Sequence, residues 1–337
     1  MTPRPSNALK YLVSVLLTVG LLYFTFRGTD VGKLSSSIQG ANYGWIAAMF
    51  VCLMLSHAVR AWRWRYFLDP IKPGISFRNL FSGVMIGYTV NNILPRAGEF
   101  VRPYSIGKLE SLPKSAALGT IVVERIIDTA SFLVLVIIIP FVYEGPLVET
   151  FPWLHQAGIL ISAGTFGFLV TAIVLMVRRD WTNALLKRVT RFLSPSLSQR
   201  FDRVVHSFLD GFLFLRRPGG FLAILFLSVL VWFLYVVMTY VAFFSFGMDR
   251  LGFGAAVVVL AISSVGIAIP TPGATGSYHW FAAQTLIKLF HIPAEVALSY
   301  ATVTHAVGFI GVSVIGIYYF VRDHVSIRDA MTRTGEE

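Results

Sequence analysis

The chain has 337 residues, of which 55% are hydrophobic and 13% charged, and this charged fraction is about half of that in an ordinary soluble domain. The composition therefore excludes a water-soluble fold and predicts an α-helical membrane protein. The formal net charge of +11 does not indicate a nucleic-acid partner, because the Lys and Arg residues lie mainly between apolar runs and form no basic recognition module.

The first apolar run, Tyr11–Phe26, follows Arg4 and Lys10 and has no small-residue cleavage site after it. We interpret it as an uncleaved signal anchor that crosses outward from a cytoplasmic N-terminus. A second span, from Trp45 to about Val59, returns to the cytoplasmic side.

A basic stretch follows this second span. It consists of Arg60, Arg63 and Arg65 interleaved with Trp62 and Trp64. Because positive charge is enriched in cytoplasmic loops and Trp at membrane interfaces, we interpret the stretch as an interfacial anchor. Recruitment of anionic lipid is the alternative.

The next apolar run, Leu80–Leu94, is interrupted by Gly and Asn residues and ends at Pro95. It is shorter than the roughly 20 residues that cross a bilayer comfortably. Non-helical backbone at membrane depth is tolerated only where it is buried in protein or lines a cavity. We therefore predict a re-entrant hairpin over residues 80–112 that enters from the cytoplasm.

The remaining spans cross the membrane in alternating directions, and the charge of each loop indicates on which side of the membrane it lies. The segment with Glu144 and Glu149 is expected to be external, and residues 178–217 to lie on the cytoplasmic surface as amphipathic helices. A second broken hairpin is expected over 253–290, entering from outside. The further spans are Ala116–Val142, His155–Val177, Phe221–Phe246 and Val296–Val321. The predicted fold is an all-α polytopic membrane protein with about six full spans and two re-entrant hairpins.

The two hairpins share a sequence pattern. Pro95-Arg-Ala-Gly98 and Pro270-Thr-Pro-Gly273 each close an interrupted apolar run. Glu124-Arg125 and Thr304-His305 then lie at equal distances after Pro113 and Pro293. Because the halves would run in opposite directions, the pattern predicts an inverted repeat, which is typical of a transporter whose site lies near the midplane. Two Gly- and Pro-kinked packing helices are the alternative.

These features predict a single membrane domain, 1–337. Its parts are a first half-repeat, 43–143, a connecting region, 144–218, a second half-repeat, 219–321, and a cytoplasmic tail, 322–337.

Three charged residues lie within the apolar run after the first hairpin. Each charge at mid-helix costs about 2.5–3.5 kcal/mol on insertion scales. Glu124 and Asp128 share a helix face, and Arg125 is offset from them by about 100°. In one interpretation Arg125 binds a headgroup phosphate and a carboxylate couples transport to a proton or cation. In the other, the charges form a structural ion pair that fixes the hairpin.

Further candidates lie at the two breaks. Arg96, Glu99 and Arg102 follow the first break, where free amides and guanidinium groups favour an anion; an interfacial loop with a Glu99–Arg102 pair is the alternative. Asn92 is expected to satisfy broken backbone or to face a headgroup. At the second break we expect substrate contacts from Pro272, Gly273, Gly276 and His305, although a buried His that only bonds a neighbouring helix is equally compatible.

The segment Asn92–Glu99, the pairs Arg102-Pro103 and Glu124-Arg125, Asp128, and Pro270–Gly273 with Gly276 together resemble the lysylphosphatidylglycerol synthase transmembrane-region family, a flippase-like group of the UPF0104 type. The resemblance covers nearly the whole chain and implies lipid transport. Bifunctional members of this family carry a soluble aminoacyl-transferase domain, whereas the longest segment outside the predicted spans here is 178–217. The chain also departs from the family at Ser277-Tyr278-His279, where an acidic residue is expected.

We therefore expect a flippase that moves an anionic phospholipid or an isoprenoid-phosphate lipid between leaflets, and not an enzyme. An accessory subunit of an envelope-lipid synthase and an intramembrane enzyme acting on lipid headgroups are the alternatives. The expected partners are anionic membrane lipids, with such a synthase as a possible protein partner. The single Cys52 and the absence of metal-ligand spacing predict no metal or other cofactor. The expected location is a prokaryotic plasma membrane, with both termini cytoplasmic.

Overall fold

The computed structural model describes residues 5–153 and 218–326, together with single positions between 156 and 199. These residues form helices joined by turns and loops, and no strand occurs among them. The longer helices are α1 (Pro5–Phe26), α3 (Tyr43–Leu68), α4 (Phe77–Ile93), α5 (Gly98–Glu110), α6 (Lys114–Val142), α11 (Pro218–Phe244), α12 (Gly252–Ala268), α13 (Ser277–Phe290) and α14 (Ala294–Arg322). Shorter elements are α2 (Val31–Gln39), α7 (Leu147–Thr150), η2 (Asp249–Leu251) and η3 (Pro272–Ala274).

Within the described residues, five helices are long and apolar enough to cross a membrane. They are α3, α6, α11, α14 and α12 with the turn before it. A sixth is added if α1 and α2, which meet at 91°, count as one broken span. The chain is therefore an all-α polytopic membrane protein, as its composition predicts.

Helix α3 continues past the predicted end of the second span. The prediction ended the span near Val59, but α3 runs on to Leu68. The basic stretch is thus helical, and Arg60, Arg63 and Trp64 are buried, whereas Trp62 and Arg65 remain largely exposed. The interpretation of this stretch as an interfacial anchor was wrong for its buried members, because helical periodicity turns them inward.

Both predicted hairpins are present as pairs of short helices joined at a break. The α4 and α5 helices have 17 and 13 residues, and α12 and α13 have 17 and 14. At 1.5 Å per residue these lengths correspond to about 20–26 Å, less than the roughly 30 Å hydrocarbon layer. Although η2 and α12 together have the length of a span, α13 packs back along α12.

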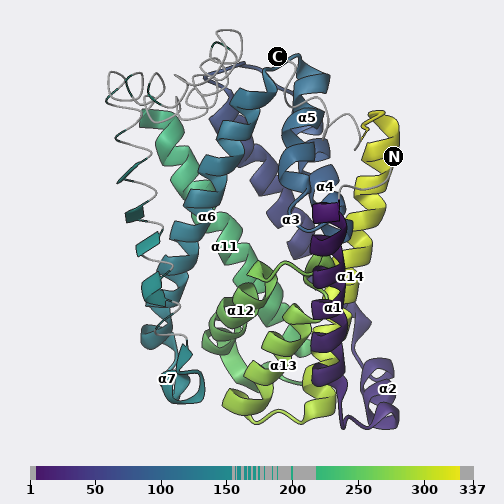
Figure 1. Ribbon diagram of the computed structural model, residues 1–337. Helices are drawn as coiled ribbons and strands as arrows, with labels where there is room; N and C mark the ends of the chain where they lie inside the picture. Colours follow the sequence, from purple (N-terminus) through teal and green to yellow (C-terminus); the bar gives the residue numbers. More distant parts are fainter. Residues whose placement is uncertain are drawn as a thin grey trace.

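The two hairpins lie at opposite ends of the molecule (Figure 1). The α4–α5 pair occupies the upper part of the view and the α12–α13 pair the lower part, and both turn back near mid-height. The long helices α6, α11 and α14 run alongside both levels (Figure 1). Their breaks therefore face each other near the middle of the molecule.

Close contact between α4 and α5 depends on glycine. A Cβ at Gly98 would overlap the carbonyl oxygen of Gly87, and one at Gly87 would lie 3.3 Å from the Cβ of Arg102. The amide of Gly98 donates a hydrogen bond to Asn91 Oδ1 at 2.7 Å. The Asn91 side chain thus caps the first break, and the lack of a side chain at Gly98 lets the two helices pack closely there.

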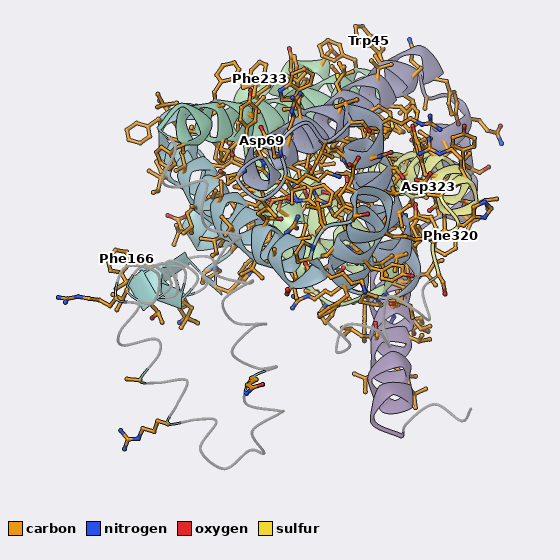
Figure 2. The ribbon with its side chains drawn as sticks, turned by 90° about the horizontal axis from the view of Figure 1, so that it is seen from above. Trp45, Asp69, Phe166, Phe233, Phe320 and Asp323 are labelled. Carbon is orange, nitrogen blue, oxygen red and sulfur yellow. The ribbon has the colours of Figure 1, made fainter. Side chains whose placement is uncertain are left out.

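Aromatic side chains cover the perimeter of the helices. Viewed from above, Trp45 on α3 and Phe233 on α11 lie at the outer edge (Figure 2), where they are 41% and 51% exposed. Apolar exposure of this kind suits a lipid environment. The predicted span His155–Val177 and the amphipathic segment 178–217 lie outside the continuously described residues.

Candidate functional site

The α6 helix places two carboxylates on one face, deep within the bundle. Glu124 is completely buried, and the side chain of Asp128 is 12% exposed. Their i, i+4 spacing puts one above the other. Glu124 lies about 15 Å along the helix from Lys114, which is about half of a bilayer core.

Two arginines of α3 reach these carboxylates. Arg60 Nη1 lies 2.6 Å from Glu124 Oε1 and 2.7 Å from Asp128 Oδ2. Arg63 Nη2 lies 2.7 Å from Asp128 Oδ1 and 3.3 Å from Glu124 Oε1. Tyr235 and Ser228 on α11 accept further hydrogen bonds from Arg60 and Arg63. The ion pairs thus join α3 to α6, and the hydrogen bonds join α3 to α11.

Arg102 brings the first hairpin into the same cluster. Its Nη1 lies 2.8 Å from Glu124 Oε2, and the side chain is 6% exposed. The guanidinium carbon lies 3.8 Å from the ring centroid of Trp64, a cation–π geometry. Trp64 is itself held by a 3.0 Å hydrogen bond to Thr120 Oγ1. The alternative Glu99–Arg102 pair is not found among the described residues, because Arg102 pairs with Glu124.

Arg125 is the accessible member of the cluster. Its Nη2 lies 3.3 Å from Glu124 Oε1 and 3.5 Å from Asp128 Oδ2. The side chain is 42% exposed, in contrast to the near-complete burial of Arg60, Arg63 and Arg102. Since its ion pairs are the looser ones, Arg125 is the guanidinium best placed to meet a group from outside.

The cluster carries more positive than negative charge. Four guanidiniums, those of Arg60, Arg63, Arg102 and Arg125, face two carboxylates, so the sum is 4 − 2 = +2. A buried charge without a counter-ion is strongly unfavourable. The cluster is therefore suited to an added anion.

The residues at the first break contact other helices. Asn92 Nδ2 donates to Ser313 Oγ and to the Phe309 carbonyl oxygen on α14, at 2.9 and 3.2 Å. Arg96 is exposed, and its Nη2 donates to the carbonyl oxygen of Ala268 at the end of α12, at 3.1 Å. The polar groups of this break thus bind the second hairpin and α14.

The second break is a tight loop around Pro272 and Gly273. Gly273 has φ = +55°, and a Cβ there would lie 2.6 Å from the Phe309 ring. His305 Nε2 donates to the Gly273 carbonyl at 2.8 Å, and the ring centroid of His279 lies 4.6 Å from that of His305. The Gly276 amide donates to His279 Nδ1. His305 therefore holds the loop.

The predicted site residues fall into two groups. Arg102, Glu124, Arg125 and Asp128 come together in the charged cluster. The second group comprises Asn92, Arg96, Pro272, Gly273 and His305, at the contact between the two breaks, and Gly276, which lies beside Thr18 and Leu21 of α1. Glu99, which is partly buried, has no ion pair with a described residue.

Sequence reasoning missed Arg60 and Arg63 as members of the site. A signal was present, since Arg60, Arg63 and Trp64 are spaced i, i+3 and i+4 and Phe67 continues the same stripe. All four are buried. Alternation of Arg and Trp is typical of a membrane interface, whereas the helical period of 3.6 residues indicates a buried face. Among the described residues, no group of three His, Cys, Asp or Glu side chains could hold a metal ion.

Comparison with known proteins is consistent with this architecture. The family described as "Lysylphosphatidylglycerol synthase TM region" matches residues 11–316. A UPF0104 membrane protein of Methanocaldococcus jannaschii is 25% identical over 321 residues, which cover 90% of this chain and 92% of the relative. Another, of Methanothermobacter thermautotrophicus, is 24% identical over 284 residues, covering 80% of this chain and 83% of the relative.

A longer relative also matches. The protein named Glycosyltransferase AglD, of Haloferax volcanii, is 23% identical over 363 residues, which cover 99% of this chain and 58% of the relative. No solved structure matches the chain.

Proposed function

Because the chain belongs to the lysylphosphatidylglycerol synthase TM region family, we propose that it is a flippase that moves an anionic lipid between the leaflets of the bilayer. The observation that carries the proposal is the buried cluster of four arginines and two carboxylates, with its excess of positive charge. Guanidinium groups bind phosphate through paired, charge-assisted hydrogen bonds. The headgroup enters at Arg125, and the acyl or isoprenoid tails stay in lipid.

The two hairpins supply the moving parts. Their breaks are joined by polar contacts, from Arg96 to Ala268 and from His305 to Gly273, which can be exchanged without unfolding a long helix. We propose that the halves 43–143 and 219–321 form an inverted repeat, and that alternating closure of the hairpins exposes the cluster to each leaflet in turn. Glu124 and Asp128 hold the guanidiniums in place as structural charges.

The membrane in this proposal is the plasma membrane of a prokaryote. Positively charged residues gather at and beside the turns that connect α3 to α4 and α5 to α6. They are Arg65, Lys72, Arg78, Lys108 and Lys114. The positive-inside rule therefore makes this end of the molecule, and with it both termini, cytoplasmic.

Leaflet exchange in liposomes tests the function. The purified protein is reconstituted with fluorescent phosphatidylglycerol, and exchange is followed by dithionite quenching. Arg125→Ala should lower the rate by about tenfold or more, because it removes charge-assisted hydrogen bonds to the headgroup. Arg65→Ala, which removes an exposed arginine of α3, is the matched control and should retain the rate. Exchange of anionic lipid that is unaffected in folded Arg125→Ala would refute the proposal.

A second candidate is an accessory subunit of an envelope-lipid synthase. It is favoured by the alignment of nearly the whole chain with part of the longer protein named as a glycosyltransferase. In this case the chain would co-purify with a lipid-modifying enzyme, and deleting it would reduce that enzyme's activity while liposome exchange stays at background. Transport by the purified protein alone would exclude an exclusively accessory role.

A further inference from the structure

Several guanidinium donors in the cluster lack an acceptor. Within the part of the chain that the structure describes, no hydrogen-bond partner is found for the buried Nε atoms of Arg60, Arg63, Arg102 and Arg125, or for Nη2 of Arg102. Most buried polar atoms in proteins are paired. Arg102, which is 5% exposed, thus presents two unused donors inside the protein.

The side chains around the cluster do not balance its charge. Tyr88 offers a ring face and Tyr235 a hydroxyl group to Arg60, and Trp64 offers a ring face to Arg102. His57, against the Tyr88 ring, adds another unpaired nitrogen, Nδ1. Among the described residues, Glu124 and Asp128 remain the only carboxylates paired with these arginines. The excess of two positive charges is therefore a property of the whole cluster and its described neighbours.

This charge and donor set discriminates between two kinds of phosphate. A phosphate esterified once has three terminal oxygens and a charge of about −1.5 to −2 at pH 7. A phosphate within a diester has two such oxygens and a single charge. Only the former can neutralise the cluster almost completely and accept hydrogen bonds from several guanidiniums at once.

We infer that the arginine cluster selects a terminal phosphate, the headgroup of a lipid phosphomonoester, over the phosphodiester of ordinary phospholipids. This inference rests on the proposed flippase function and narrows its substrate class. The lipid, not free phosphate, is the source, because the cluster lies at membrane depth and opens through Arg125, on a helix whose apolar side chains Val134, Ile137 and Phe141 are exposed. Phosphatidic acid and polyprenyl monophosphates have the required headgroup.

Matched lipids test the inference. Liposomes of phosphatidylcholine contain, in separate samples, a fluorescent phosphatidic acid, phosphatidylglycerol with the same tails, or a polyprenyl monophosphate. At least one monoester lipid should exchange about tenfold or more faster than phosphatidylglycerol, because it gains further charge-assisted hydrogen bonds. Equal or faster exchange of phosphatidylglycerol would overturn the inference and leave the flippase proposal intact. No exchange of any anionic lipid by folded protein would overturn both.

A charge-reducing variant separates recognition from folding. Arg102→Gln lowers the excess charge from two to one and should reduce the preference for the monoester several-fold more than it reduces phosphatidylglycerol exchange. Arg65→Gln, the exposed control on α3, should keep the preference. Should Arg102→Gln fail to fold, Arg125→Gln makes the same change at the more accessible position. An equal decline for both lipids in a folded variant would assign the arginine a structural role and contradict the inference.

Inorganic phosphate distinguishes the two sources of the anion. If the ligand is a lipid, excess inorganic phosphate should slow the exchange of the monoester lipid only weakly. The tails of the lipid keep its headgroup in the membrane, close to the cluster. Thermal stabilisation of the detergent-solubilised protein by inorganic phosphate, together with absent exchange of all lipids, would assign the cluster to a free anion and refute the lipid assignment.

Discussion

Glu124 is fully buried, and guanidinium nitrogens of four arginines lie within 3.3 Å of its carboxylate oxygens. The carboxylate thereby links α3, α5 and α6, the helices that supply these arginines. A single buried carboxylate that serves several cations is energetically costly to remove, because the cations remain in the interior after it is gone. Its contribution is thus to hold the arginines, and part of their charge is not balanced by Glu124 and Asp128.

Glu124→Gln should lower the free energy of unfolding by about 3–5 kcal/mol, since it leaves buried guanidiniums without their shared counter-ion. Reversible unfolding in mixed detergent micelles, followed by circular dichroism, measures this change. Asp69→Asn removes the partly exposed partner of Arg65, 3.8 Å away, and should change the stability by no more than about 0.5 kcal/mol. A similar small change in both variants would show that the cluster does not stabilise the fold.

At the scale of elements, each hairpin depends on a break that the neighbouring helices hold. Asn91 caps the first break, and Asn92 ties it to α14. The second break is held by His305 and by Ser14 of α1, whose hydroxyl donates to the Pro270 carbonyl at 2.6 Å. Free backbone groups at membrane depth need such partners.

Gly98→Ala should separate α4 from α5, because the added methyl group would overlap the Gly87 carbonyl oxygen. We expect a lower melting temperature in detergent and loss of lipid exchange, with a cost of about 1–3 kcal/mol from overpacking. Gly20→Ala is the control, since a Cβ at that position of α1 meets no atom within 4 Å and alanine favours a helix. Unchanged melting of Gly98→Ala would mean that the hairpin does not pack this closely.

Arg96→Ala removes the hydrogen bond between the first break and Ala268. Because Arg96 binds the other hairpin and lies outside the charged cluster, the variant should change the rates of all lipids by a similar factor and leave headgroup selectivity unaltered. Parallel exchange assays with phosphatidic acid and phosphatidylglycerol measure this. A selective loss of one lipid would instead make Arg96 a headgroup ligand, as the sequence alone suggested.

Across the whole molecule, the hairpins enter from opposite ends and meet near mid-height (Figure 1). The charged cluster lies among α3, α5 and α6, whereas His279, His305 and Tyr278 lie together between the second hairpin and α14. The surroundings of the two hairpins thus differ in charge. We propose that the headgroup binds on the charged side of the contact and that the other side acts as a gate.

Cysteine labelling tests the proposed orientation. In a Cys52→Ser background, Ser111→Cys at the α5–α6 turn should react with an impermeant maleimide only after the cells are opened. Ser35→Cys, on α2 at the opposite end (Figure 1), should react in intact cells. Both positions are exposed, so a difference in reactivity reports sidedness. The reverse pattern would invert the topology.

Amino-acid order by itself determined the class of fold, the family and the positions of both hairpins. Apolar length and the Gly and Pro breaks are local properties, because the hydrocarbon layer acts on each segment separately. The motifs Glu124-Arg125 and Pro270–Gly273 are also local, so the sequence alone reveals them. Helix α2, by contrast, was not predicted, although Asp30 caps its N-terminus.

Only the tertiary structure decided which arginines form the site. Arg60 and Arg63 lie more than sixty positions before Asp128, yet they pair with it. Arg96, adjacent to the break, turns toward Ala268 and away from the cluster. The physical reason is that a buried charge is stabilised by its nearest counter-charge, and the packing of α3 against α6 and α11 sets which charges are near.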